Sequence, residues 1–366
     1  MLQHPTYTIK QRPEEFKVDE VPLYAPSGEG EHIYLGIRKS NVSHEELIRR
    51  VAKSFGVKRH DVGSAGRKDL YAVTTQVLSV YLPTGDMMIP ELGDGIDVLW
   101  STRHENKLRT GHLIGNRFDI TVRDVNSAHI VYVNQKLKEV SVNGLPNLFG
   151  PQRFGNDGMN PRVGLLLLQA NWEKCVNVLR TSNARFTVQW KDEPPEKLCK
   201  KIPKSMHKLY LNAFQSKLFN DVLRIRQEQD SLNTCLLGDL VWAHTGKGSS
   251  FELDEHELAS EAFVERMRNC QVSATGPLFG IKMRQPSGRP LDVEQRVLAE
   301  SGVTIQQLEQ VKQIMSGSRR PLRVPVSQST LTSGVDEHGN FIRVQFELPA
   351  GSYATVLIDE LLNVSP

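Results

Sequence analysis

Apolar and polar residues alternate with a period of two along several short stretches of the first 150 residues. Residues 16–21 and 32–37 are the clearest, and a loop rich in Gly, Pro and Ser separates them. Similar stretches predict strands at 72–82, 95–100 and 117–123. The sequence Ser-His-Glu-Glu at 43–46 is typical of a helix N-terminus and predicts an amphipathic helix that ends near Gly56.

Helical periodicity replaces this alternation in the middle of the chain. The pattern there predicts helices near 162–181, 206–230, 255–269 and 291–316. Beyond Arg320 the alternation returns, and it predicts strands at 327–331 and 341–348 before a last helix at 353–362. This order predicts a discontinuous domain that an inserted module interrupts. Its two parts would be residues 1–157 and 319–366, and the insertion would be residues 158–318.

Composition places the chain among ordinary soluble globular proteins. It has 366 residues, of which 39% are hydrophobic and 24% charged, so about two domains are expected. The longest apolar run, near 163–168, is far too short to span a bilayer, and no signal segment opens the chain. The cysteines are far apart and form no CxxC pair, which indicates neither a disulfide scaffold nor structural zinc. We expect a cytoplasmic protein that does not bind membranes.

Positive charge is concentrated in three segments, although the net charge is only +3. Residues 197–226 hold eight Lys or Arg against one acid, and the segments 103–117 and 319–323 are also basic. Segregated cations can form a surface that binds a polyanion on a nearly neutral protein. The alternative for any single segment is a solvated helix face. Three such segments together favour a phosphate-rich partner.

Common cofactor motifs are absent from the sequence. It contains no GxxxxGK[ST], no GxGxxG after a strand, no HExxH and no GxSxG, and the histidines lack metal-ligand spacing. We therefore expect neither a nucleotide cofactor nor a metal. What remains is a set of loops rich in glycine and aromatic residues, which can bring backbone close to a ligand and stack a base.

Taken together, these loops resemble the TruD family of tRNA pseudouridine synthases. The match covers nearly the whole chain and consists of FKVDE (16–20), GEGEH (28–32), GRKD (66–69), AVTTQ (72–76), KLRTGH (107–112), GNRF (115–118), FGPQRFG (149–155), LYLNAFQS (209–216), ATGPLFG (274–280), RPLR (320–323) and LPAGSYAT (348–355). Any single match is weak evidence, but this many in order is highly specific. The resemblance implies an α+β fold. A pseudouridine synthase catalytic domain, with a mixed, mostly antiparallel sheet flanked by helices, would be interrupted by an inserted helix-rich TRUD domain.

The resemblance also implies a reaction. A tRNA uridine, uridine 13 in the bacterial family, would be isomerised to pseudouridine without a cofactor or a metal. The base must first leave its stack, at a cost of a few kcal/mol, because side chains cannot reach the reacting atoms inside folded RNA. The expected partner is tRNA, and the expected state of the protein is a monomer.

Four residues receive roles from this resemblance, and Phe149, two residues after Asn147, is a fifth candidate. Asp69 would be the catalytic aspartate, and Phe16 and Phe346 would line the uridine site. Asn147 matches a polar substrate-binding position, where an amide can both donate to and accept from the uracil edge. Phe149 would stack against the flipped base. Core packing is the alternative for each phenylalanine.

Several cations are candidate RNA contacts or loop anchors. A nearby cation favours an ionised carboxylate, but adjacent side chains on an extended strand point to opposite faces. The cation that pairs with Asp69 therefore stays open, and it could come from a distant loop. The candidate RNA contacts are Lys68, Lys107, Arg109, His112 and Arg117.

The sequence departs from the family pattern in two places. Leu70-Tyr71 replaces the charged or polar residues that many relatives place after the aspartate, and Leu148 stands at a position where an aromatic residue is common in the family.

Two other functions are the alternatives. A non-catalytic RNA-binding protein or tRNA folding chaperone would not need the intact GRKD motif and Asn147. A hydrolase that releases uracil would need a second acid at a set distance from Asp69, and the sequence shows no obvious one.

Overall fold

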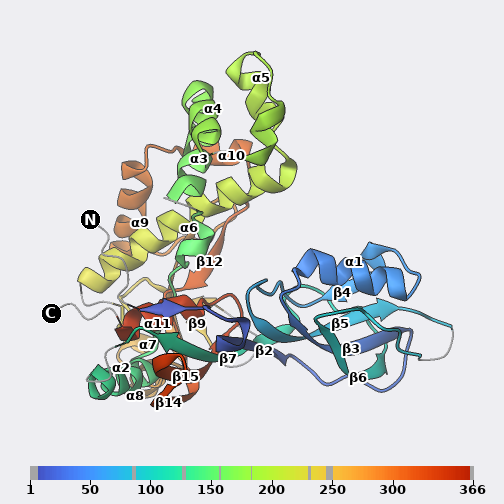
Figure 1. The fold of residues 1–366 in the computed structure, drawn as a ribbon. Helices are drawn as coiled ribbons and strands as arrows, with labels where there is room; N and C mark the ends of the chain where they lie inside the picture. Colours follow the sequence, from blue (N-terminus) through green and yellow to red (C-terminus); the bar gives the residue numbers. More distant parts are fainter. Residues whose placement is uncertain are drawn as a thin grey trace. The chain divides into compact units, whose positions relative to one another are not determined.

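The structure is a computed structural model, and it describes residues 7–84, 88–125, 129–155, 158–182, 184–229, 232–244 and 250–362 (Figure 1). It divides into two compact units. Unit 1 consists of Met1–Ser141 and Val326–Pro366, and unit 2 consists of Val142–Pro325. The expected insertion at 158–318 falls within unit 2, and residue 157 at its boundary lies outside the described residues. The definition of a TRUD domain therefore stays a prediction.

Unit 1 is built on a nine-stranded sheet. Seven strands follow the order β14 (Ser327–Asp336), β15 (Gly339–Pro349), β7 (Leu113–Arg123), β2 (Phe16–Pro22), β5 (Val73–Tyr81), β3 (His32–Ser40) and β6 (Ile96–His104), while β1 (Thr8–Ile9) pairs with β7 and β4 (Val62–Ser64) with β5. The β2–β5 pair is parallel, and the other pairs among the described strands of this sheet are antiparallel. The expectation of an α+β fold with a mixed sheet and helices is confirmed.

Three α-helices of the described chain lie wholly or mostly in unit 1: α1 (His44–Ser54), α2 (Ile130–Asn143), whose last two residues belong to unit 2, and α11 (Ala354–Leu362). As predicted, Ser43 caps α1 by accepting a hydrogen bond from the backbone N–H of Glu46. Helix α1 lies over β4 and β5 in Figure 1, and its Leu47 and Val51 join the core that the sheet builds beneath it. The sequence did not predict α2, because its valines obscure the helical stripe of buried residues.

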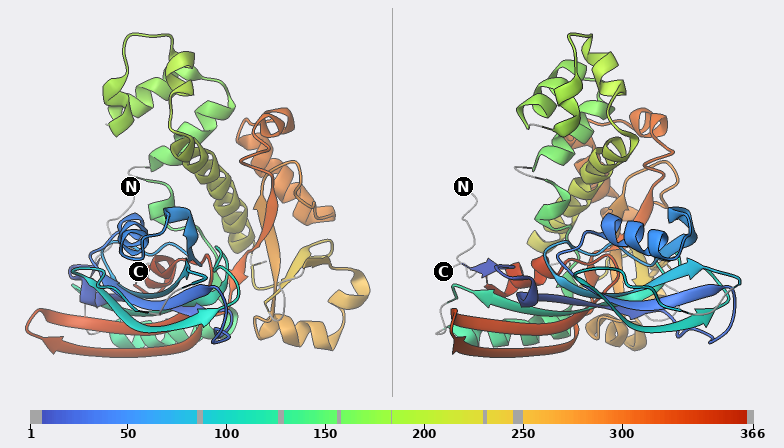
Figure 2. Two further views of the ribbon diagram at one scale, coloured as in Figure 1. Left: turned by 90° about the vertical axis from the view of Figure 1, so that its right-hand side faces the viewer. Right: turned by 45° about the vertical axis from the view of Figure 1, so that its right-hand side comes forward.

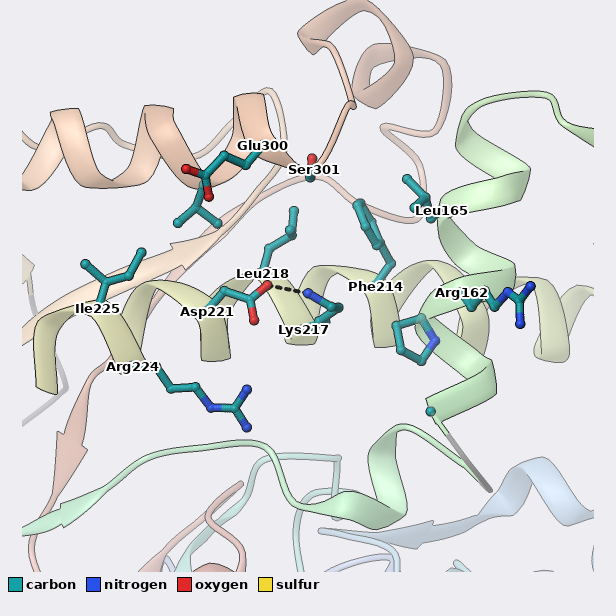
Figure 3. Close-up of a pocket in the computed structure, with 13 residues that line it drawn as sticks. Arg162, Leu165, Phe214, Lys217, Leu218, Asp221, Arg224, Ile225, Glu300 and Ser301 are labelled. Carbon is teal, nitrogen blue, oxygen red and sulfur yellow. Dashed lines mark hydrogen bonds and ion pairs between the residues drawn. The ribbon is translucent and has the colours of Figure 1, made fainter. Parts of the chain in front are cut away.

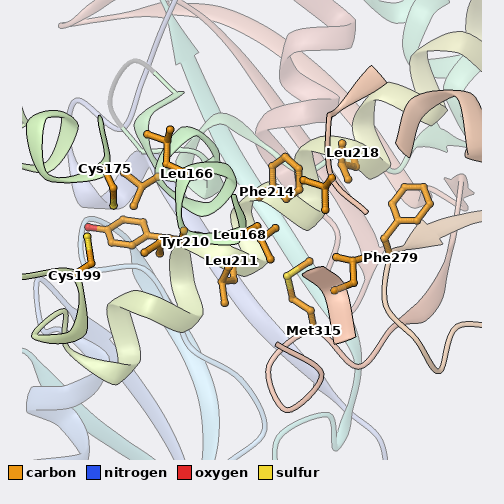
Figure 4. Close-up of a cluster of buried hydrophobic side chains, with 14 of the residues drawn as sticks. Leu166, Leu168, Cys175, Cys199, Tyr210, Leu211, Phe214, Leu218, Phe279 and Met315 are labelled. Carbon is orange, nitrogen blue, oxygen red and sulfur yellow. The ribbon is translucent and has the colours of Figure 1, made fainter. Parts of the chain in front are cut away.

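Helices dominate unit 2. They are α3 (Met159–Leu168), α4 (Trp172–Thr181), α5 (Pro195–Lys200), α6 (Lys204–Glu228), α7 (Glu255–Leu258), α8 (Glu261–Arg268), α9 (Gly288–Glu300) and α10 (Ile305–Gln310). The long helix α6 contacts both α3 and α9, as the two views of Figure 2 show. Its Tyr210, Phe214 and Leu218 are buried in one apolar cluster together with Cys175 and Met315 (Figure 4).

Three of the predicted helices of unit 2 are wrong as single helices, and each is two helices with a capped break. The predicted helix 162–181 breaks where Ala170 takes a φ of 52° and Asn171 caps α4. The predicted helix 255–269 breaks at Ser260, which caps α8, and the predicted helix 291–316 breaks at Gly302, whose φ is 69°. The predicted helix 206–230 is confirmed as α6.

Unit 2 also contains strands that the sequence did not predict. A four-stranded sheet has the order β10 (Ser250–Glu252), β9 (Leu240–Ala243), β11 (Val272–Leu278) and β12 (Ser318–Pro321), and β8 (Leu145–Pro146) pairs with β13 (Arg323–Val324). These strands are short, and six of the seven residues of β11 are buried, so the alternation that marks a half-buried strand is missing. Short 3-10 helices lie at Pro13–Glu15, Arg59–Asp61, Pro151–Arg153 and Arg185–Gln189. Over the described ranges, no helix combines the length and apolarity needed to cross a membrane.

Candidate active site

Asp69 lies in the irregular loop that joins β4 to β5. The two strands are antiparallel neighbours, so the loop of residues 65–72 turns at the edge of their pairing. Lys68 and Asp69 are neighbours in sequence but differ in burial: the Asp69 side chain is 46% exposed, whereas that of Lys68 is 5% exposed. Leu70 and Tyr71, the two departures from the family pattern, are also exposed.

The cation that pairs with Asp69 is Lys10. The Lys10 ammonium donates a hydrogen bond of 2.5 Å to a carboxylate oxygen of Asp69, and it lies 4.0 Å from the centre of the Phe16 ring. Lys10 has a φ of 61°, a left-handed conformation that costs a non-glycine residue roughly 1 kcal/mol or more. Lys10 and Asp69 are far apart in sequence, and no motif marks Lys10, so inspection of the GRKD motif could not identify it.

Lys68 belongs to a buried polar cluster beneath the loop. Its ammonium lies 3.3 Å from a carboxylate oxygen of Glu20 and donates a hydrogen bond to the side chain of Asn116. Burial raises the pKa of Glu20 and lowers the pKa of Lys68, and the attraction between the two groups offsets part of both shifts. These contacts favour a structural role for Lys68 over the expected contact with RNA.

Phe16 and Phe346 come together through a third aromatic ring, Phe118. Phe118 lies opposite Phe346 in the β7–β15 pair and opposite Val18 in the β2–β7 pair. The Phe118 ring stacks on Phe346 with centroids 5.2 Å apart, and it meets Phe16 edge-on at 6.4 Å. All three rings are buried, and a contact of Phe16 or Phe346 with a uracil stays a prediction. Phe118 lies in the GNRF motif and was not assigned a role from the sequence.

The other candidate RNA contacts of unit 1 differ in exposure. Lys107 donates a hydrogen bond to the backbone carbonyl of His60, and the His112 imidazole lies 2.8 Å from the Tyr24 hydroxyl. Both contacts anchor loops. Arg117 pairs with Glu347 at 2.6 Å but its side chain is 61% exposed, and Arg109 is exposed. Arg109 and Arg117 are therefore the two of these four residues whose side chains are exposed.

In unit 2, hydrogen bonds within the protein occupy the side chain of Asn147. Its amide nitrogen donates to the Pro321 carbonyl at 2.9 Å, and its amide oxygen accepts a hydrogen bond of 2.5 Å from Arg320. Asn147 is 4% exposed. A role of Asn147 in binding uracil stays a prediction.

Phe149 is half-buried and is fixed by α6 and β12. The side chain of Asn220 accepts a hydrogen bond from the Phe149 N–H and donates one to its carbonyl, at 2.9 and 3.0 Å. The Phe149 ring packs edge-on against Phe219 at 5.6 Å, and the Arg320 guanidinium lies 4.3 Å from its centre. These contacts fix the position of the Phe149 ring, and its stacking against a base stays a prediction.

Much of the basic charge of unit 2 is internal. Arg319 forms an ion pair with Glu294, and Arg226 forms one with Asp239, at 2.7 and 2.9 Å between buried side chains. Arg323 is buried and donates to backbone carbonyls. The basic segment 319–323 is therefore structural, contrary to our expectation of a charged surface. The segment 197–226 keeps exposed cations: Lys197, Lys200, Lys201, Lys204, Lys208, Lys217 and Arg224.

A cavity of about 590 Å³ lies on the side of α6 that faces α9 and α3 (Figure 3). Leu165, Phe214 and Ile225 supply its apolar lining, and Lys217 and Asp221 form an ion pair of 2.6 Å at its rim. None of the residues predicted for the uridine site lines this cavity.

No group of three or more His, Cys, Asp or Glu side chains in the described part of the chain is arranged to hold a metal ion. The four cysteines are buried thiols.

Comparison with known proteins identifies close relatives of this chain. The family model described as "tRNA pseudouridine synthase D (TruD)" matches residues 5–193 and 187–361. A protein of Geobacter metallireducens named tRNA pseudouridine synthase D is 35% identical over 97% of this chain and 95% of its own length. The protein of the same name from Geotalea daltonii is 33% identical over 97% of this chain and 96% of its own length.

A solved structure is similar in fold. The crystal structure of a Methanosarcina mazei protein assigned as tRNA pseudouridine synthase D (TruD) superimposes with a TM-score of 0.75 at 24% identity, covering 97% of this chain and 93% of that one. At this identity the comparison shows the fold alone.

The buried pair beneath the loop predicts unequal effects at adjacent positions. We expect Lys68→Met to destabilise unit 1 by about 3–5 kcal/mol, because it leaves Glu20 buried without its cation. Without Lys68, the pKa of Glu20 in the folded state rises further above its value in the unfolded state. The folded variant therefore loses stability as the pH rises from the unfolded-state pKa to the folded-state pKa. Its loss of stability relative to wild type is larger at pH 8 than at pH 5. Hydrogen exchange of the β2 and β5 amides measures this in unit 1 alone.

Arg67→Met is the matched control for this prediction. The Arg67 side chain is 75% exposed and pairs with an exposed Glu45, so the change should lie within about 0.5 kcal/mol of wild type. Equal effects at positions 67 and 68 would contradict the structural role of Lys68.

Proposed function

Because this chain belongs to the TruD family of tRNA pseudouridine synthases, we propose that it converts uridine 13 of tRNA to pseudouridine with Asp69 as its catalytic group. Membership of the family makes the protein an isomerase that acts on tRNA. The observation that supports Asp69 most directly is its ion pair with Lys10, which orients an exposed carboxylate on a loop that is held from beneath.

The reaction breaks the bond between N1 of the uracil and C1′ of the ribose and forms a bond between C5 and C1′. C5 loses its proton and N1 gains one, so the product is an isomer and needs no co-reactant. In its ionised form, the Asp69 carboxylate can attack the sugar, add to the ring or remove a sugar proton. Each route requires the carboxylate to approach the flipped nucleotide, and an exposure of 46% makes that approach sterically feasible.

Four further residues are proposed to bind the uridine. Phe16 lies next to Lys10 and, with Phe346, belongs to an aromatic row on the same sheet face, so these rings can supply an apolar wall near the acid. The proposed roles of Asn147 and Phe149 rest on the FGPQRFG motif and the residues before it. They also rest on the hydrogen bonds that fix the Asn147 side chain and the Phe149 backbone.

We expect wild-type protein to form pseudouridine at position 13 of an unmodified tRNA transcript, and Asp69→Asn to bind the transcript without forming product. The amide has nearly the same shape but cannot act as a nucleophile or base. Site-specific mapping of pseudouridine measures the product. Asp97→Asn, which alters an exposed acid on β6, should leave the yield unchanged.

Three results would argue against this proposal. Product formation by Asp69→Asn would remove Asp69 from the chemistry. Release of free uracil would indicate a hydrolase, and tight binding by wild type without any turnover would indicate an RNA-binding protein or chaperone.

We expect Lys10→Met to lower the rate of product formation by about 10- to 100-fold with little change in tRNA affinity, because the carboxylate loses the group that orients it. Lys10→Arg should retain more activity, since it keeps a charged donor. Single-turnover rates at saturating enzyme separate the chemical step from binding. Lys58→Met, at an exposed position of the same unit, is the control. A wild-type rate for Lys10→Met would show that the ion pair is not needed.

The exposed cations of segment 197–226 predict a salt-dependent affinity. If they bind phosphate, the combined change Lys204→Ala, Lys208→Ala and Arg224→Ala should weaken tRNA binding and reduce the slope of log K against log salt by about one for each phosphate that the variant no longer neutralises. Lys312→Ala, an exposed cation outside this segment, should leave the slope unchanged. Equal slopes for wild type and the triple variant would show that these side chains do not bind the RNA.

A further inference from the structure

Lys39 is a fully buried lysine at the end of β3, and its ammonium contacts the backbone of the proposed catalytic residue. The side chain is 0% exposed. Its ammonium donates one hydrogen bond of 2.6 Å to the backbone carbonyl of Asp69 and another of 2.8 Å to the backbone carbonyl of Val42. The same group therefore ties the loop that carries Asp69 to the loop that leads into α1.

Burying this charge is costly, and the fold does not offset the cost with a salt bridge. Moving an ammonium out of water costs several kcal/mol unless an opposite charge or strong hydrogen bonds replace the solvent. None of the ion pairs formed by the described residues includes Lys39. Its hydrogen bonds go to two carbonyl oxygens, which are neutral, so a methionine at this position would cost less to bury. A role at the Asp69 loop would explain why a lysine is used.

The charged groups around Lys39 come from two elements. The 65–72 loop contributes the Asp69 carboxylate, which attracts the ammonium, and the Lys68 ammonium, which repels it. Helix α1 contributes His44, whose pKa is lowered by burial, so His44 is neutral near pH 8. Opposite Lys39 on β5 stands the uncharged Thr74. Burial lowers the pKa of Lys39 to about 8, and the attraction of Asp69 offsets part of this shift.

We propose that Lys39 is a positioning residue for the reaction: its ammonium fixes the backbone of Asp69 while Lys10 orients the carboxylate, so that the acid is held from two sides. This inference rests on the proposed function of Asp69. A charged donor makes stronger hydrogen bonds to carbonyl oxygens than a neutral amine does. Loss of the Lys39 proton therefore loosens the loop without removing any group that touches the substrate.

The wild-type enzyme itself provides the first test. Single-turnover rates of pseudouridine formation, measured with saturating enzyme between pH 7 and 9, should fall as Lys39 loses its proton near pH 8. If wild type forms no pseudouridine at any pH, the proposed function fails. If it forms pseudouridine at a rate that is constant over this range, the proposed function stands and the positioning role of Lys39 is wrong.

The second test assigns the pH dependence to Lys39. Lys39→Met should lower the rate at pH 7 by about 10- to 100-fold, because small displacements of a catalytic group are costly, and should abolish the fall near pH 8 while tRNA affinity is unchanged. Lys53→Met, an exposed position on α1, should keep the wild-type rate and profile. A Lys39→Met variant with the wild-type rate, or with the fall near pH 8 intact, would overturn the proposal. If the variant does not fold, the wild-type profile decides.

Discussion

Two buried ammonium groups, those of Lys39 and Lys68, hold the loop that carries Asp69. Lys39 contacts the backbone of the loop, and Lys68 contacts Glu20 and Asn116 below it. These contacts come from strands β3, β2 and β7, which are separate in sequence and adjacent only in the folded sheet. The position of the Asp69 carboxylate therefore depends on the register of the whole sheet. A one-residue slip of β3 would move Lys39 to the opposite face and release the loop.

The ends of the chain make different contributions to unit 1. The loop, Lys10 and the buried cluster beneath Asp69 all come from residues before position 124, whereas Phe346 is supplied by β15 near the C-terminus. The pairing of β15 with β7 joins segments more than 200 residues apart, and closing so large a separation is a slow, non-local step of folding. The aromatic row of Phe16, Phe118 and Phe346 is thus completed only after unit 2 has been synthesised.

Sequence patterns predicted the elements whose apolar residues recur with a clear period. Strand β2 and helix α1 have one buried face, and β3 was located from its alternation although most of its residues are buried on both faces, as are those of β5. Strand β9 was missed because it has only four residues, and β11 was missed because its Gly276 and Pro277 are typical of a loop. The helix breaks were missed although Asn171 and Gly302 are ordinary break signals. In the candidate site, family motifs pointed to Asp69 but not to Lys10, since an ion pair between distant segments leaves no local pattern.

Two buried polar residues of β5 lower the stability of the sheet. Leu78 and Val80 pack in the apolar core with α1, but Thr74 and Gln76 lie on the same face at 0% and 2% exposure. Within the described protein, the Thr74 hydroxyl and both polar atoms of the Gln76 amide lack a hydrogen-bond partner. Apolar residues would be cheaper to bury at both positions. The costly residues lie at the end of β5 nearest Asp69, beside the buried Lys39. Such breaches of local stability rules are expected at functional sites. Thr74, Gln76 and the two buried ammonium groups all lie near the loop that carries Asp69. Their concentration there indicates that this part of the sheet holds the loop in place at a cost in stability.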